Sequence, residues 1–515
     1  TAALELTVTG PTLRFLSGGL TLTGPIKTST GNVTLTTNGG ALNLATYGIS
    51  AGEYASGGAN IALTGRGIIQ AAGSINATGG SVGTGPSTGT SGGTITLTGH
   101  DGTAAGDIVL SGTVQTASAS ASASAVTIRG TSALALPNIS APNGGLVLGD
   151  STPTIGAITG AITQSATTSV DVKTLNVTGG SSAVLANTGN KIFQLGAISV
   201  GDNAAVQYDF DAYDSTSGLS LTQSITSAGG LRLRTATGDG ASGALAIGVR
   251  SITAHGDVFL GGDSVTQSLG SVIDADSGSI RVDGGSNAFN ISLLGTTQTA
   301  STAGTAIEIV GATNATLNVV SATAGTVTLG VTGKELTGTV AQVADTGTLS
   351  AATLAGKAGV VTLNKTYLDN LGSFITTGAL TLKDLGGAGT AGLKLTGNVV
   401  AGAASSIETT DGVLDLDTHS VDATGVDMVL KGVAVSQTTG SSIKSTTASI
   451  FGNTGNITLD SVPLPLTRPN VSICRGYPEV LTVMRRAPMS SPAGSWSLPS
   501  IPRGLERRRS VARVG

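Results

Sequence analysis

A short phrase, Gly-φ-Thr-φ-Thr with φ aliphatic, recurs along most of this chain and constrains its fold more than any other feature. Copies and near copies begin at Gly19, Gly93, Gly325 and Gly378. The alternation of aliphatic and hydroxyl residues predicts short strands with one buried and one exposed face. The leading glycine is expected to supply a backbone φ above zero before each strand. Short strands repeated at near-regular spacing predict a solenoid.

The composition agrees with a long, thin stack of coils. Only 11% of the 515 residues are charged and 3% aromatic, whereas 78 are glycine; globular domains average about 25% charged residues. Strand-like φ-x-φ triplets recur at about 9–13 and about 18–20 residues, which predicts about 20 residues per coil and about 23 coils. The predicted fold is all-β, a right-handed parallel β-helix over residues 1–462. Loop excursions are expected near 79–93 and 201–218.

The last segment, residues 463–515, has a different composition. It holds eight of the 14 prolines, nine arginines, Trp496 and Cys474, and no copy of the repeat. We expect it to be disordered or translated out of frame. The alternative is a basic anchor that ends at Arg507–Arg509.

Charge and cysteine content exclude several classes of partner and site. Residues 1–462 carry 17 basic and 28 acidic side chains, a net charge of −11, which argues against nucleic-acid binding. The same segment has no cysteine, which excludes a disulfide framework and a cysteine metal site. No run of 18 apolar residues predicts a transmembrane segment, and no motif predicts a cofactor. Because the chain opens at Thr1, we expect a processed piece of a longer exported protein.

A second phrase, Thr-Gln-Ser, accompanies the repeat. It contains Gln164, Gln223 and Gln267, and Gln437 lies in the related Ser-Gln-Thr. We expect these glutamines to satisfy backbone groups at turns or in ladders. A row of ligand-facing amides is the alternative.

With these glycine-led strands, the Thr-Gln-Ser phrase, and 179–187 leading to 195–200, the chain resembles the filamentous-haemagglutinin-like exoproteins over about residues 1–462. The resemblance implies a secreted adhesin at the surface of a Gram-negative bacterium, exported by two-partner secretion through an outer-membrane partner. It implies multivalent attachment to host-cell or surface glycans and proteins, or to other copies of the chain. The family's Asn-Pro-Asn-type secretion motifs are missing, since the sequence contains no Asn-Pro.

Two other functions remain open, a carbohydrate-active β-helix enzyme and a passive structural stalk. Glycoside hydrolysis needs two carboxylates at a defined separation. Of the motifs seen in pectin hydrolases only His255-Gly256 occurs, without an Asp-Asp pair or an Arg-Ile-Lys. We therefore predict no enzyme and no catalytic residue, with His255 as a turn residue.

One segment is a candidate ligand-binding site. Tyr208, Phe210 and Tyr213 alternate there with Asp209, Asp211 and Asp214. Three carboxylates could supply oxygen ligands to Ca²⁺, but aromatic rings beside carboxylates also suit a carbohydrate-binding loop, and we predict a ligand site without a metal. The alternative is a solvated insertion that packs its rings on the rod. A last alternative, an ice-binding threonine face, requires threonine in every successive coil.

Overall fold

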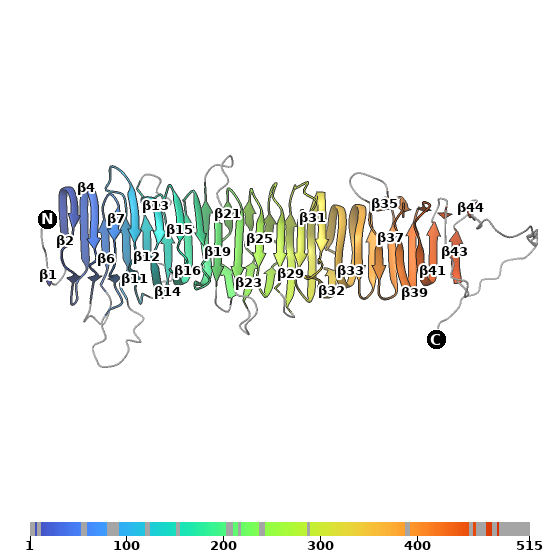
Figure 1. Ribbon diagram of the computed structural model, residues 1–515, viewed down its shortest axis with the longest axis horizontal. Coiled ribbons are helices and arrows are strands. Elements are labelled where there is room, and N and C mark those ends of the chain that lie inside the picture. The colour runs from blue at the N-terminus through green and yellow to red at the C-terminus, as the bar shows by residue number, and fades with distance from the viewer. Residues whose placement is uncertain are drawn as a thin grey trace, which may run out of the picture.

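The chain forms one elongated rod of stacked coils in a computed structural model, with its two termini toward opposite ends (Figure 1). The structure describes residues 6–7, 12–52, 59–79, 92–118, 124–150, 155–201, 210–214, 218–235, 243–285, 289–386, 392–452, 457–459, 470–475 and 482–483. These residues hold 44 strands, from β1 (Leu6–Thr7) to β44 (Thr482–Val483), and no helix. Consecutive coils pair in parallel along the whole rod, which confirms the predicted parallel β-helix.

Each coil contributes three strand segments, and each segment pairs with its counterpart in the next coil. One column of inward side chains, called here the middle column, contains the functional site. Its register partners run through consecutive coils as Ala183, Phe210, Leu231, Val258, Ile280 and Ile307. They lie in β17 (Ser182–Leu185), β19 (Phe210–Asp214), β22 (Leu231–Thr235), β25 (Val258–Gly261), β28 (Ile280–Asp283) and β30 (Ile307–Val310).

The coils are longer than predicted. Ile225 and its register partner Ile252 are 27 residues apart (252 − 225), and Val399 and Val421 are 22 apart (421 − 399). Ile75 and Val114 pair across 39 residues (114 − 75). The rod therefore holds fewer than the predicted 23 coils. The triplet spacings measured the distance between strands, whereas a full coil also includes three corners of variable length.

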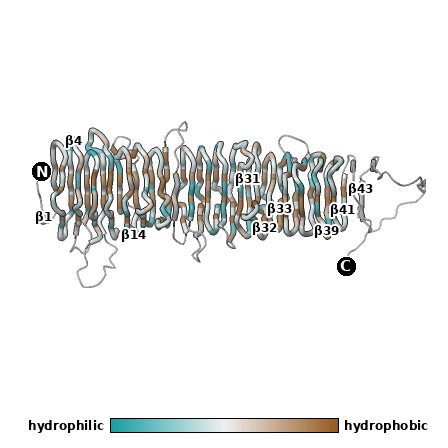
Figure 2. The backbone as a smooth tube through the Cα atoms, in the orientation of Figure 1, coloured by the Kyte–Doolittle hydropathy of each residue, from teal (hydrophilic) through white to brown (hydrophobic). Residues whose placement is uncertain are grey.

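Aliphatic side chains fill the interior, and the hydropathy alternates along each coil (Figure 2). In β4 (Val33–Ala45), Val33 and Leu35 are fully buried while Thr34 and Thr36 are half-buried. Burying one such aliphatic side chain stabilises the fold by about 1.5–3 kcal/mol. The predicted arrangement, with aliphatic residues inside and hydroxyls outside, is confirmed for this strand.

The threonines do not form a continuous face. The outward column that passes through Thr34 changes residue type from coil to coil. Its register partners are Thr34, Ala62, Thr96, Thr127, Val147 and Asn176. The ice-binding alternative is therefore wrong for this column, because alanine, valine and asparagine interrupt the threonine row.

The glycines that lead the repeat act through their size. None of the glycines at 19, 93, 325 and 378 adopts a φ above zero, so the prediction about their backbone conformation was wrong. A Cβ on Gly93 would lie 2.1 Å from the carbonyl oxygen of Ala59, and one on Gly19 would lie 2.8 Å from that of Ala41. The neighbouring coil passes so close at these corners that any side chain would collide with its backbone.

The glutamines of the second phrase mostly satisfy buried polar groups, as predicted. The Gln267 amide donates to the carbonyl oxygens of Ser271 (3.2 Å) and Thr296 (2.9 Å) and is 2% exposed. The Gln164 amide donates to Asn190 Oδ1 at 2.6 Å, and Asn190 Nδ2 donates back to Gln164 Oε1 at 3.0 Å. Gln223 is exposed and differs from the others. A ligand-facing row of all four amides is therefore wrong.

The predicted boundaries fall largely on residues outside the described set. Of the excursion at 79–93, the structure describes 79 and 92–93. Of the segment 463–515 it describes only β43 (Asn470–Arg475) and β44. β43 pairs in parallel with β41 (Ile443–Gly452), and β44 pairs with β42 (Ile457–Leu459). The ladder therefore extends past residue 462.

Candidate ligand-binding site

The predicted aspartate and aromatic cluster lies partly within the rod. Tyr208 and Asp209 lie outside the described residues. Phe210, Asp211, Tyr213 and Asp214 belong to β19, which pairs with β17 on one side and β22 on the other. The sequence places alanine at the centre of this strand, and Ala212 is 1% exposed between its partners Leu185 and Leu233. The expectation of a loop excursion is therefore wrong for residues 210–214, which form a rung of the ladder.

The register aligns this strand with charged and aromatic residues in the next three coils. Asp211 is the Cα partner of Arg232, Arg232 of Phe259, and Phe259 of Arg281. Each of the last three lies between two buried aliphatic residues of its strand. Because strand side chains alternate between faces, Arg232, Phe259 and Arg281 all project outward. We call these three residues the Arg-Phe-Arg row.

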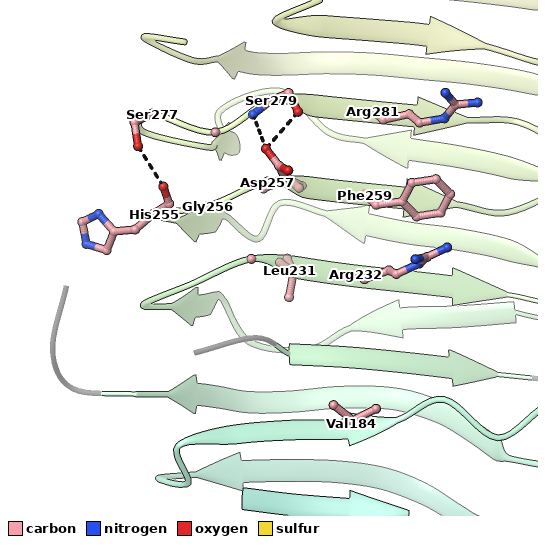
Figure 3. Close-up of a pocket in the computed structure, with 13 residues that line it drawn as sticks. Val184, Leu231, Arg232, His255, Gly256, Asp257, Phe259, Ser277, Ser279 and Arg281 are labelled. Atoms are coloured by element: carbon pink, nitrogen blue, oxygen red, sulfur yellow. Dashed lines mark hydrogen bonds between the residues drawn. The ribbon is translucent and has the colours of Figure 1, made fainter. Parts of the chain in front are cut away.

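The row lines a hollow of about 730 Å³ on the outer face of the rod. Figure 3 shows Arg232, Phe259 and Arg281 one above the other on successive strands, with Val184 further along the same face. The other side of the hollow is the corner before the strands, where His255, Asp257 and Ser279 lie. The volume falls within the range of small-ligand sites, about 300–1,000 Å³.

Phe259 and Arg232 form a stacked pair. The guanidinium carbon of Arg232 lies 4.8 Å from the centre of the Phe259 ring, within cation–π distance. The ring leans along its own strand over Gly261, since a Cβ on that glycine would lie 2.7 Å from Phe259 Cε1. Glycine at position 261 thus leaves room for the ring on the sheet surface.

Arg281 is held by carboxylates on the far side of the hollow. Its guanidinium forms ion pairs with Glu308 and, at 3.2 Å, with Asp283. Asp283 also pairs with Lys334, and its side chain is 7% exposed. The positive charge of Arg281 is therefore largely balanced, and its side chain is fixed in place. No such pair is described for Arg232, so among the described side chains it is the row's cation without a carboxylate partner.

The corner of the hollow is held by hydrogen bonds between coils (Figure 3). Asp257 Oδ1 accepts from the backbone N–H of Ser279 at 2.8 Å and from its hydroxyl at 2.9 Å. The Ser277 hydroxyl donates to the His255 carbonyl at 3.1 Å. The His255 ring lies 2.9 Å from Asp276 Oδ2 and is 46% exposed. His255 thus sits at a corner, as predicted for a turn residue.

The hollow lacks the arrangement that glycoside hydrolysis requires. Among its described lining residues Asp257 is the single carboxylate, and its Oδ1 already accepts two hydrogen bonds. A hydrolase needs a second carboxylate across the scissile bond, about 5–10 Å away. Paired carboxylates facing a groove, which the enzyme alternative requires, are not found among the lining residues that the structure describes.

Searches for other kinds of site give two findings. Within the described ranges, no group of three or more His, Cys, Asp or Glu side chains could hold a metal ion. None of the described residues forms a helix long and apolar enough to cross a membrane. The predicted Ca²⁺ ligands Asp209, Asp211 and Asp214 are not among the side chains that the structure describes.

Sequence reasoning missed the Arg-Phe-Arg row because its members are 27 (259 − 232) and 22 (281 − 259) residues apart. A signal was nevertheless present. Most φ-x-φ triplets carry a small or hydroxyl residue in the middle, whereas three consecutive middle-column triplets carry Arg, Phe and Arg. Large residues in successive triplets of one column would have indicated this face.

Comparison with known proteins found no match to any family model, to any curated protein or to any solved structure.

Proposed function

We propose that this chain is the rod of a large secreted adhesin that projects from the surface of a Gram-negative bacterium. The observation that carries this proposal is the unbroken stacking of the middle column. Residues in this column pair coil by coil from Leu20 to Leu354, with outward residues in matching register beside them. Neighbouring strands are about 4.8 Å apart. The rod therefore carries outward side chains at fixed, closely spaced intervals along its length.

Such a surface suits attachment by many weak contacts. Once one contact has formed, the next occurs at an effective concentration of about millimolar or higher, because both partners are already tethered. Rigid spacing keeps this gain, whereas a flexible chain would lose part of it to conformational entropy. The resemblance to filamentous-haemagglutinin-like exoproteins supports the same function and an export route through an outer-membrane partner.

The same fold also suits a passive stalk, and the density of coating separates the two. Beads carrying the full chain at graded densities should adhere to host-cell monolayers with a steep dependence on density, while the soluble monomer binds weakly. Beads coated at equal density with a β-helix protein of unrelated outer surface are the control. Adherence equal to that of the control beads at every density would identify a stalk and contradict the proposal.

The location can be tested separately on intact cells of the source bacterium. Antibodies against the rod should label unpermeabilised cells, and added protease should remove the label. Labelling that appears only after permeabilisation would contradict surface exposure.

A further inference from the structure

We propose that the hollow along the Arg-Phe-Arg row binds an acidic sugar residue of a polysaccharide, with its anionic group on Arg232 and its ring on Phe259. This inference rests on the proposed adhesive function and names the chemistry of one contact. It concerns the side chains of three adjacent strands, β22, β25 and β28, and of the corner beside them.

Arg232 supplies the anion-binding group. It is exposed, and its described contact is the face of the Phe259 ring. A guanidinium stacked on an aromatic ring keeps its N–H groups, which lie in its own plane, free for hydrogen bonds. These donors match a carboxylate or a sulfate in a two-pronged arrangement. Arg281 is already paired with Glu308 and Asp283, so it frames the hollow and leaves the free charge to Arg232.

Phe259 supplies the apolar surface. A pyranose ring presents a face of C–H groups, which packs against an aromatic ring through many small dispersion contacts. Gly261 leaves the ring space to lie along the sheet instead of standing away from it. The hollow therefore combines a planar apolar surface with an adjacent cation, which suits a ligand that is apolar on one face and anionic at its edge.

The corner supplies acceptors for sugar hydroxyls. Asp257 uses Oδ1 for the two bonds from Ser279, and no partner is described for its Oδ2. Because a carboxylate oxygen accepts strong hydrogen bonds, Oδ2 can receive a hydroxyl of a sugar that rests on Phe259. The volume of about 730 Å³ leaves room for more than the anionic group alone.

The overall charge separates this ligand from other polyanions. Residues 1–462 carry a net charge of −11, from 17 basic and 28 acidic side chains. Long-range attraction for a highly charged polyanion is therefore absent, and binding depends on the local fit of charge and ring. An acidic sugar offers both features, whereas a polyanion without sugar rings offers charge alone.

The experiment titrates the full chain with four probes and follows binding by saturation-transfer NMR and calorimetry. Tetragalacturonate carries only carboxylates, and a carrageenan tetrasaccharide carries only sulfates. Maltotetraose is the neutral control, and a short polyglutamate peptide is the control for charge alone. Either acidic tetrasaccharide should bind at least about tenfold more tightly than both controls, and the tighter of the two identifies the anionic group.

Matched variants locate the binding. Arg232→Gln should weaken the acidic probe about tenfold and Phe259→Ala about fivefold, since each removes one of the two contacts. Gly261→Ala, which displaces the ring without deleting it, should weaken binding about threefold. Arg250→Gln removes an exposed arginine at another corner, and Phe193→Ala removes an aromatic ring that is 40% exposed on another face. Both controls should change affinity less than about twofold.

The inference is overturned if the acidic tetrasaccharides bind no better than maltotetraose or polyglutamate. It is also overturned if the two control variants weaken binding as much as Arg232→Gln and Phe259→Ala. Circular dichroism of each variant establishes that it folds, and Phe259→Leu replaces Phe259→Ala if the alanine variant does not. Beads that adhere although the chain binds no acidic sugar would refute this inference and leave the adhesin intact. Sugar binding without density-dependent adherence would refute the adhesin instead.

Discussion

Gln267 and Gln223 occupy the same position in two copies of Thr-Gln-Ser, yet they have opposite environments. Gln267 is 2% exposed and donates to two backbone carbonyl oxygens, whereas Gln223 is exposed. The pair therefore tests whether a buried amide between coils stabilises the rod. We compare Gln267→Ala with Gln223→Ala in otherwise identical chains.

The structure sets the expected magnitude. Gln267→Ala removes the donor to Thr296 O at 2.9 Å and one of the donors to Ser271 O. Ser271 O keeps the backbone N–H of Thr296 at 2.9 Å, so Thr296 O suffers the larger loss. A buried group left without its partner costs about 1–3 kcal/mol, and the truncated side chain leaves a cavity as well. We expect about 3 kcal/mol less free energy for local opening, roughly a hundredfold in exchange rate.

Hydrogen exchange measured by mass spectrometry suits this test, because a solenoid can open locally without global two-state unfolding. The reporting peptides cover β26 (Ser264–Gln267) and β29 (Asn290–Gln298). Gln267→Leu, which fills most of the volume without the hydrogen bonds, should recover only part of the loss. Gln223→Ala should stay within about 0.5 kcal/mol of the parent chain. Equal effects of the two alanine variants would refute the reasoning.

Three further predictions concern single buried or clamped side chains. Hydrogen bonds, first from the Thr103 hydroxyl, lower the pKa of Asp101 against the opposing effect of burial, so its contribution to stability is present above the unfolded pKa of about 3.9 and is lost on acidification; Asp101→Asn should speed exchange of the Gly39 amide about tenfold at pH 7, with a smaller difference below pH 4. Burial raises the pKa of Asp384 although backbone N–H groups oppose the shift, so its contribution is largest below the unfolded pKa and is lost as pH rises through the folded one; relative to Asp384→Asn, the parent chain should gain thermal stability between pH 7 and pH 4, and a flat difference would contradict this. Phe374 is fully buried, so Phe374→Ala should cost about 3–5 kcal/mol in local opening by hydrogen exchange, against less than about 1 kcal/mol for the exposed Phe193→Ala.

The fold could be predicted from the sequence because its determinants are local. In a triplet such as Leu231-Arg-Leu233, alternation alone decides which side chains are buried, and the structure agrees. The coil length could not be predicted, because it depends on corners such as the one between Ile75 and Val114, where no periodic pattern exists. The role of Gly93 was misjudged for a similar reason, since the nearby Ala59 carbonyl belongs to another coil.

The candidate site was less accessible to sequence reasoning. The cluster at 208–214 attracted attention because its charged and aromatic residues are adjacent in sequence, and the strand at 210–214 was read as a loop. The Arg-Phe-Arg row is assembled by register alone, which composition does not reveal. Its face nevertheless adjoins the predicted segment, because Asp211 is the register neighbour of Arg232.

The uneven corners have a consequence for how such a protein can change over time. Ile49 and Ile75 stack across 26 residues (75 − 49), and Ile75 and Val114 stack across 39, yet each pair stays in register. Sequence length and axial height are thus independent variables, because insertions at a corner leave the rungs above and below undisturbed. Lineages can lengthen, shorten or exchange corner segments while the spine stays constant, and an engineer can graft a foreign peptide there without redesigning the interior.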